Sequence, residues 1–392
     1  MRVKHKLILS LVISIVMLMC SYWVTNLHVP ISGEKTVISW YEAIKGIFGK
    51  PDYNVENNDV LLIDVDYDKE LITKTNEFGR PLGDAYPVTD RRKLLTLLDT
   101  LKKRDDYEYV MLDVAFEQGE ETDADSALFA VISSMNRIVI PCDSLNALPH
   151  EMLQEKAGLA EYYITPVETD FVKYPYLKSD TTLKSMPFVM FEDVFKSKIR
   201  KHWLFYTDDS GRLARRTIVL NLDYLPKPSA WRKIGTDILY ADRIKSLITK
   251  DKVVVIGSAK ADLHATYRDR VSGAIINLNA YQALKDGHHI VSPPVILLLA
   301  ISFFVFSYLI LSQRTLSDSL SVKNFHKNKW VRLLQLALNS LCSWLGFSLF
   351  LTALCVITYS VLHEVYDIFV TSTLFYIIKK IVKFVNYMRY EK

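Results

Sequence analysis

The chain has 392 residues, of which 50% are hydrophobic and 23% are charged, with a formal net charge of +4. Its mean hydropathy of +0.11 is high for a soluble protein with this many charges, so the apolar residues must be concentrated in particular segments. The central region lacks a basic helix with interleaved aromatic residues, which argues against nucleic-acid binding. Three of the four cysteines lie in apolar runs and none belongs to a CxxC or Cys/His cluster, so no structural zinc site, internal disulfide or cofactor is expected.

The first apolar run, residues 7–26, follows a basic N-terminal segment, residues 1–6. A cleaved signal peptide is the alternative interpretation. It would need small residues before the cleavage point, but residues 17–19 are Met, Leu and Met. We therefore expect an uncleaved transmembrane helix with the basic segment in the cytoplasm, because cytoplasmic flanks of membrane proteins are rich in Lys and Arg.

Three more apolar runs follow near the C-terminus. They cover residues 293–312, 333–362 and 365–385. The loop 313–332 and the tail 386–392 are basic, whereas the turn before residue 365 is acidic. This charge pattern predicts four spans in a bacterial inner membrane, with residues 27–292 outside and both basic segments inside. The last run is short and rich in lysine, so a basic amphipathic helix on the membrane surface is the alternative.

The first half of the outer domain, residues 27–292, alternates between strand and helix patterns. A lead-in helix is expected over residues 36–48. Strands are predicted over 60–65, 109–116 and 138–140, and helices over 90–104, with Thr89 as the N-cap, and over 123–134. This alternation predicts right-handed crossovers and a mixed, largely parallel α/β sheet with flanking helices.

The second half of the outer domain is less regular. Residues 149–240 are interpreted as an α+β insertion with antiparallel strands on the sheet edge. Its alternating stretches are residues 162–167, 203–206 and 217–222, and its helix is residues 188–198. A helix over 241–249, a strand over 252–257 and a last helix over 275–286 are predicted next, and Gly287 suits the left-handed end of that last helix.

Several motifs in this order carry a resemblance. They are LLIDVD (61–66), YPVTDRRKLLTLLDTL (86–101), VMLDVAF (110–116), KVVVIGSA (252–259) and NLNAYQALKDG (277–287). With one span before them and about three after, they resemble the second type of CHASE domain, an extracellular sensor of bacterial cyclases and histidine kinases. The resemblance covers roughly residues 5–380 and implies a sensory role.

The chain departs from this family's pattern in three places. Tyr86-Pro87 stands where the family usually has Trp-Pro, and Ser272-Gly273 stands where it has Pro-Gly. The family also usually continues into a cytoplasmic output module, whereas this sequence stops at Lys392. The resemblance therefore implies that a separate effector, such as a kinase or cyclase, supplies the output, or that none exists.

Acidic residues follow the predicted parallel strands, at the sheet edge where ligands of open α/β sheets bind. The candidate ligand-binding residues are Asp64, Asp66, Asp113, Asp262 and His264. Together they suit a cation, or a cationic or hydroxylated ligand. The competing interpretation is that they cap helices, fix loops or pair with Arg91 and Arg92.

Catalysis is not expected, because HExxH, Walker A and GxSxG motifs are absent and no catalytic or metal-binding residues can be named. The first functional hypothesis is a sensor subunit whose last outer helix passes a signal from a small ligand or envelope component into the spans. Asn277, Ala283 and Gly287 are the candidate coupling residues, and the bilayer, an effector and a second copy in a homodimer are the partners considered. The alternatives are a scaffold that senses nothing and, with less support, a metal-dependent envelope hydrolase.

Overall fold

The computed structural model describes residues 3–26, 34–48, 59–74, 78, 80–81, 83, 85–120, 122–160, 172–177, 184–220, 222–240, 244, 247–312, 329–362, 364–366 and 368–390. The chain forms two compact units, which we call the membrane unit (residues 1–50, 201–215 and 290–392) and the α/β unit (residues 51–200 and 216–289). The strand-like stretch predicted over 162–167 and most of the helix predicted over 241–249 lie outside the described residues.

The α/β unit contains a six-stranded sheet in the order β12-β1-β13-β4-β5-β6. The strands are β1 (Val60–Asp64), β4 (Tyr109–Leu112), β5 (Ile138–Cys142), β6 (Ala157–Leu159), β12 (Trp231–Lys233) and β13 (Val253–Gly257). Every ladder recorded between them is parallel, which confirms the predicted sheet type. β13 is central, because Val255 pairs with Leu62 on one side and with Met111 on the other.

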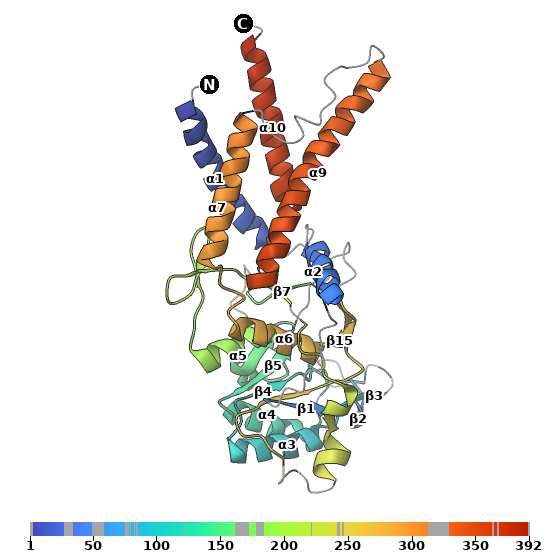
Figure 1. Cartoon of the computed structure of the whole chain (residues 1–392). Coiled ribbons are helices and arrows are strands. Elements are labelled where there is room, and N and C mark those ends of the chain that lie inside the picture. Colours follow the sequence, from blue (N-terminus) through green and yellow to red (C-terminus); the bar gives the residue numbers. More distant parts are fainter. Residues whose placement is uncertain are drawn as a thin grey trace. The chain divides into compact units, whose positions relative to one another are not determined.

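Helices cover both faces of this sheet (Figure 1). α3 (Arg91–Arg104) and α4 (Asp125–Ser134) lie on one face, and α5 (Met186–Phe195) and α6 (Gly273–Lys285) lie on the other. Alternate strand residues point to opposite faces, so Leu61 packs in the core beside α3 and α4 while Leu62 packs in the core beside α5 and α6. Both faces are buried, which explains the continuous apolar strands in the sequence.

Two helix ends follow from local hydrogen bonding. Asp90, rather than the predicted Thr89, caps α3, because its Oδ1 accepts a hydrogen bond from the backbone N–H of Lys93 at 3.1 Å. At the end of α6, Gly287 has a φ of +80° and its N–H donates to the carbonyl of Leu284, while the N–H of His288 donates to that of Ala283. This pattern is a Schellman motif, and it confirms the predicted helix end.

The predicted antiparallel edge of the sheet is wrong. β6 and β12 form the two edges and run parallel to their neighbours. The antiparallel pairs stand apart from the main sheet: β2 (Lys69–Ile72) with β3 (Tyr86–Thr89), β7 (Lys173–Pro175) with β11 (Thr217–Val219), and β14 (Leu263–Ala265) with β15 (Arg270–Ser272). The short helical turns are η1 (Leu145–Ala147), η2 (Glu151–Lys156), η3 (Pro228–Ala230) and the π-helical η4 (Ile234–Leu239).

The membrane unit consists mainly of long helices. They are α1 (Val3–Thr25), α2 (Glu34–Phe48), α7 (Pro293–Leu311), α9 (Lys329–Leu362) and α10 (Phe369–Tyr390). A small sheet of β8 (Arg200–Lys201), β9 (Tyr206–Thr207) and β10 (Leu213–Ala214) completes the described structure. α1 packs along α7, and the Ser14 hydroxyl donates to the carbonyl of Ala300 at 3.0 Å.

The prediction of four membrane spans is wrong. Among the described residues, three helices are long and apolar enough to cross a membrane: Val3–Thr25, Pro293–Leu311 and Leu338–Val361. The run predicted over 365–385 is present as the helix α10, but Lys379, Lys380 and Lys383 interrupt its apolar sequence. Charged side chains are costly inside a bilayer, so this helix lacks the composition of a span.

Candidate functional site

A cleft of about 870 Å³ opens in the α/β unit at the carboxyl ends of four strands. Its walls come from the residues that follow β1, β4 and β13 and from the end of β5. The lining includes Val65 and Asp66, the segment Asp113–Gln118, the segment Pro141–Asp143, and Ser258, Ala261, Asp262 and His264. The position agrees with the rule that open α/β sheets bind ligands beyond the carboxyl ends of their strands.

Four of the five predicted ligand-binding residues line this cleft: Asp66, Asp113, Asp262 and His264. Asp64 does not. It is buried, and its Oδ1 accepts hydrogen bonds from the backbone N–H groups of Asp66 at 3.0 Å and Ala259 at 3.3 Å. Burial raises the pKa of the Asp64 carboxyl. Asp64 therefore fixes the loop after β13 to the end of β1, as the competing interpretation expected.

The loop after β13 is held in place by further hydrogen bonds. Asp66 Oδ2 accepts from the backbone N–H of Lys260 at 2.7 Å. The Ser258 hydroxyl oxygen accepts from the N–H groups of Ala261 at 2.8 Å and Asp262 at 3.1 Å. These bonds position Asp262 at the rim of the cleft. The buried Oδ1 of Asp66 has no hydrogen-bond partner in the described part of the chain.

Asp113 directly follows β4 and is half-buried. Burial, followed by the nearby Asp262 carboxylate, raises the pKa of Asp113 to about 7, and His264 acts in the opposite direction. His264 Nε2 lies 2.9 Å from Asp262 Oδ1, and this contact raises the pKa of His264. A carboxylate and an imidazole near Asp113 thus shift its pKa in opposite directions, and burial sets the larger upward shift.

Arg91 also lines this cleft, although its sequence position does not mark it as a site residue. It is 1% exposed, its guanidinium lies 4.4 Å from the ring centre of Phe116, and its Nε lies 3.6 Å from Asp125. Arg92 instead pairs with Asp123 at 2.6 Å on the surface. In the described part of the chain, both arginines thus lie against carboxylates outside the candidate set. The TDRR sequence shows the charge but not which arginine turns inward.

No group of three or more His, Cys, Asp or Glu side chains among the described residues is arranged to hold a metal ion. The weaker hypothesis of a metal-dependent hydrolase therefore gains no support from the described geometry.

The three predicted coupling residues all belong to α6 and its end, away from the cleft lining. Asn277 is buried, and its Oδ1 accepts a hydrogen bond from the Tyr174 hydroxyl at 2.8 Å. Ala283 is also buried, so substitution there disturbs the core as well as any coupling. Residues 286–292 connect α6 to α7, and Gly287 is the second residue of that connection.

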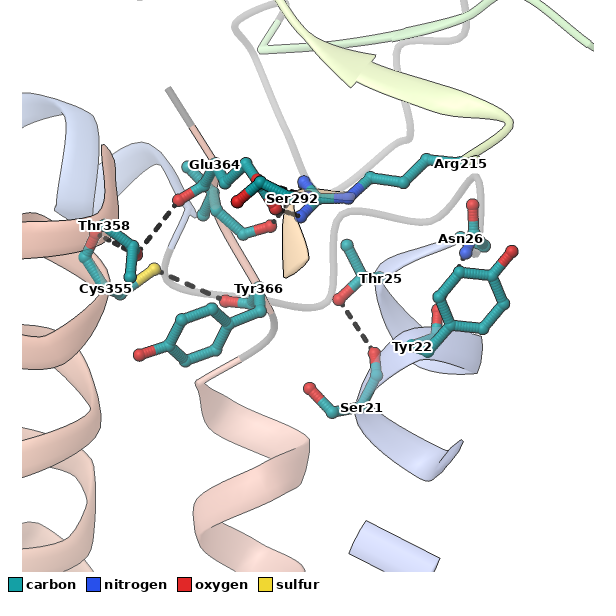
Figure 2. A network of polar contacts seen from close by, with 11 residues as sticks. Ser21, Tyr22, Thr25, Asn26, Arg215, Ser292, Cys355, Thr358, Glu364 and Tyr366 are labelled. Carbon is teal, nitrogen blue, oxygen red and sulfur yellow. Dashed lines mark hydrogen bonds and ion pairs between the residues drawn. The ribbon is translucent and has the colours of Figure 1, made fainter. Parts of the chain in front are cut away.

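A polar network joins several segments of the membrane unit (Figure 2). The Arg215 guanidinium donates to Glu364 Oε2 at 2.6 Å and to the carbonyl of Val365 at 3.0 Å, and both charged side chains are buried. Glu364 Oε1 accepts from the backbone N–H of Ser292, which precedes α7, at 2.8 Å. Glu364 therefore links the α9–α10 turn to the end of β10 and to the start of α7. The sequence by itself shows only an acidic turn here.

Comparison with known proteins identifies the family. The model of the CHASE2 domain matches residues 33–312, which is more than half of the chain. The chain therefore belongs to the CHASE2 domain family, and the resemblance seen in the sequence is confirmed. CHASE2 is a sensory extracellular domain rather than a catalytic one. With three helices of span-like length and composition, the chain is a membrane protein that carries such a domain. No curated protein and no solved structure matches it.

Proposed function

We propose that the chain is a membrane-anchored sensor subunit that binds a cationic or hydroxylated ligand in the cleft of the α/β unit. The main support is the Asp113 carboxylate, which faces the cleft and accepts no hydrogen bond within the described residues. Asp262 adds a second carboxylate, and Asp66 adds a buried oxygen that has no hydrogen-bond partner among the described residues. Buried polar groups are normally hydrogen-bonded, so a ligand with donors would satisfy these atoms.

The charge of the cleft supports the same class of ligand. Glu117 and Glu120 are already paired with Lys74, at 2.7 and 3.3 Å. The cation Arg91 is buried against Asp125. Asp262 lies beside His264, whereas Asp66 and Asp113 form no ion pair among the described residues. A bound cation or hydroxyl group would contact these two carboxylates, whereas an anion would be repelled.

Signal transmission to a separate effector, such as a kinase or cyclase, is the second part of the proposal. Residues 286–292 continue the chain from α6 into α7, and Ser292 is bonded to Glu364 in the membrane unit. A ligand that favours one packing of α6 over another would change the start of α7, provided that its affinity differs between the two packings.

Thermal unfolding of the full-length protein in nanodiscs tests the ligand class. Spermidine and calcium serve as cationic probes, glucose as a hydroxylated probe and citrate as an anionic one. We expect stabilisation by a cationic or hydroxylated probe, and we expect Asp113→Asn and Asp262→Asn, but not the surface control Asp99→Asn, to remove it. Stabilisation by citrate alone, or an unchanged response in Asp113→Asn, would contradict the proposal and favour the non-sensing scaffold.

A further inference from the structure

Three consecutive large apolar side chains are exposed between β8 and β9. Trp203 is 92% exposed, Leu204 54% and Phe205 42%. The next turn of the same small sheet, residues 208–212, is polar: Asp208 accepts hydrogen bonds from the backbone N–H and the Nε of Arg212. The tip of the sheet at residues 208–212, the polar tip, is therefore suited to water. The tip at residues 203–205, the apolar tip, is suited to an apolar phase.

This sheet is fixed to two of the candidate spans. The Tyr22 hydroxyl, near the end of α1, donates to the carbonyl of Ala214 at 2.6 Å and accepts from the backbone N–H of Tyr206 at 3.1 Å. The N–H of Val291, two residues before α7, donates to the carbonyl of Leu213 at 2.8 Å. The sheet thus lies where α1 ends and α7 begins, which is one end of this helix pair.

A cavity of about 550 Å³ lies beside the apolar tip, within the membrane unit. Leu204 and Phe205 line it, together with Leu18 and Trp23 of α1 and Val295 and Leu299 of α7. Trp23 is itself largely exposed. Apolar side chains of both spans and of the tip therefore line one cavity.

We propose that Trp203, Leu204 and Phe205 insert into the membrane leaflet at this end of α1 and α7, and that acyl chains of bilayer lipids fill the cavity. Tryptophan is enriched at the membrane–water boundary because its ring is amphipathic. Arg200 and Lys201 directly precede the tip in sequence, and their positive charges suit anionic lipid headgroups. This membrane contact does not depend on the proposed ligand.

Lipids carrying a nitroxide on the acyl chain test the insertion. The full-length chain, with its native cysteines replaced, carries a bimane label at Trp203→Cys or, as the matched control on the polar tip, at Ser210→Cys. Both proteins are placed in nanodiscs of phosphatidylcholine and phosphatidylglycerol. We expect the nitroxide lipid to lower bimane emission roughly twofold or more at position 203, because an interfacial side chain lies within about 5–10 Å of the acyl boundary. Emission at position 210 should not change.

The native protein provides a second measurement that needs no cysteine replacement. Brominated acyl chains should quench a smaller part of the total tryptophan emission in Trp203→Tyr than in the unsubstituted chain. Equal quenching at positions 203 and 210, or equal access of both labels to aqueous iodide, would overturn the proposal. Protection of position 203 from both iodide and nitroxide lipid would also overturn it, because a second copy or another part of the chain would then cover the tip.

Discussion

At the scale of single residues, Asp113 makes the stability of the α/β unit depend on pH. Its pKa is raised to about 7 in the folded protein, compared with about 3.9 for an unperturbed aspartate. Between these values the folded state holds a proton that the unfolded state has lost. Asp113 therefore lowers the free energy of unfolding as pH rises from about 4 to 7, by at most roughly 4 kcal/mol before solvent screening.

The variant Asp113→Asn should lack this contribution, because the amide does not titrate. Urea unfolding of both full-length proteins between pH 4.5 and 8 measures it. We expect the variant to gain stability relative to the unsubstituted protein as pH rises. The surface control Asp123→Asn should not, because the hydrogen bond from Arg92 lowers the pKa of Asp123 and gives the opposite sign. Parallel pH profiles for Asp113→Asn and the unsubstituted protein would disprove the assignment.

At the scale of elements, β13 and α6 meet at a glycine. A Cβ at Gly257 would lie 2.9 Å from the Cβ of Ala274 and 3.2 Å from the Cβ of Asp113. Gly257→Ala should therefore cost about 1–3 kcal/mol of stability and disturb the cleft, as overpacking does. Adding Ala274→Gly should recover part of this loss. Denaturant unfolding of the double-mutant cycle checks the coupling, and additive effects would show that the two elements do not meet there.

The buried ion pair between Arg215 and Glu364 also acts between elements, because it joins three segments of the membrane unit. Glu364→Ala leaves the guanidinium of Arg215 buried without its carboxylate. It should lower the free energy of unfolding by about 3–5 kcal/mol. The paired change Arg215→Met with Glu364→Leu should cost less, because no charge is left unpaired. Breaking the exposed Arg92–Asp123 pair should have no measurable effect. Thermal unfolding in nanodiscs compares the three, and equal losses for the first two would contradict this account.

Sequence predicts an element well when the element's own burial pattern reveals it, and poorly when contacts with residues far away in sequence decide it. The central strands β1 and β13 were predictable because burial on both faces gives short, continuous β-branched runs. The edge strands β6 and β12 have three residues each, too few to show a period. Asp66 and Asp113 could be predicted as cleft residues from their positions after strands. The role of Asp64 could not, because it depends on a backbone N–H 195 residues away.

At the scale of the whole molecule, we expect the α/β unit to lie outside the membrane, because its family is a sensory extracellular domain, and this orientation can be measured. A cysteine introduced at the exposed Ser126 of α4 should react with a membrane-impermeant maleimide in intact cells. Of the native cysteines, Cys142 and Cys355 are buried, which limits the background. A cysteine in the basic loop 313–328 should react only after the membrane is permeabilised. The reverse pattern would invert the topology.

The α/β unit is discontinuous in sequence, because residues 201–215 leave it and belong to the membrane unit. A soluble fragment cut at residues 51 and 289 would therefore retain a segment whose partners, Tyr22, Val291 and Glu364, had been removed. That fragment would expose Trp203 to Phe205 and leave Arg215 without its carboxylate, and it should self-associate. Crystallisation or grafting of the sensory module onto another receptor thus requires a short polar linker in place of residues 201–215.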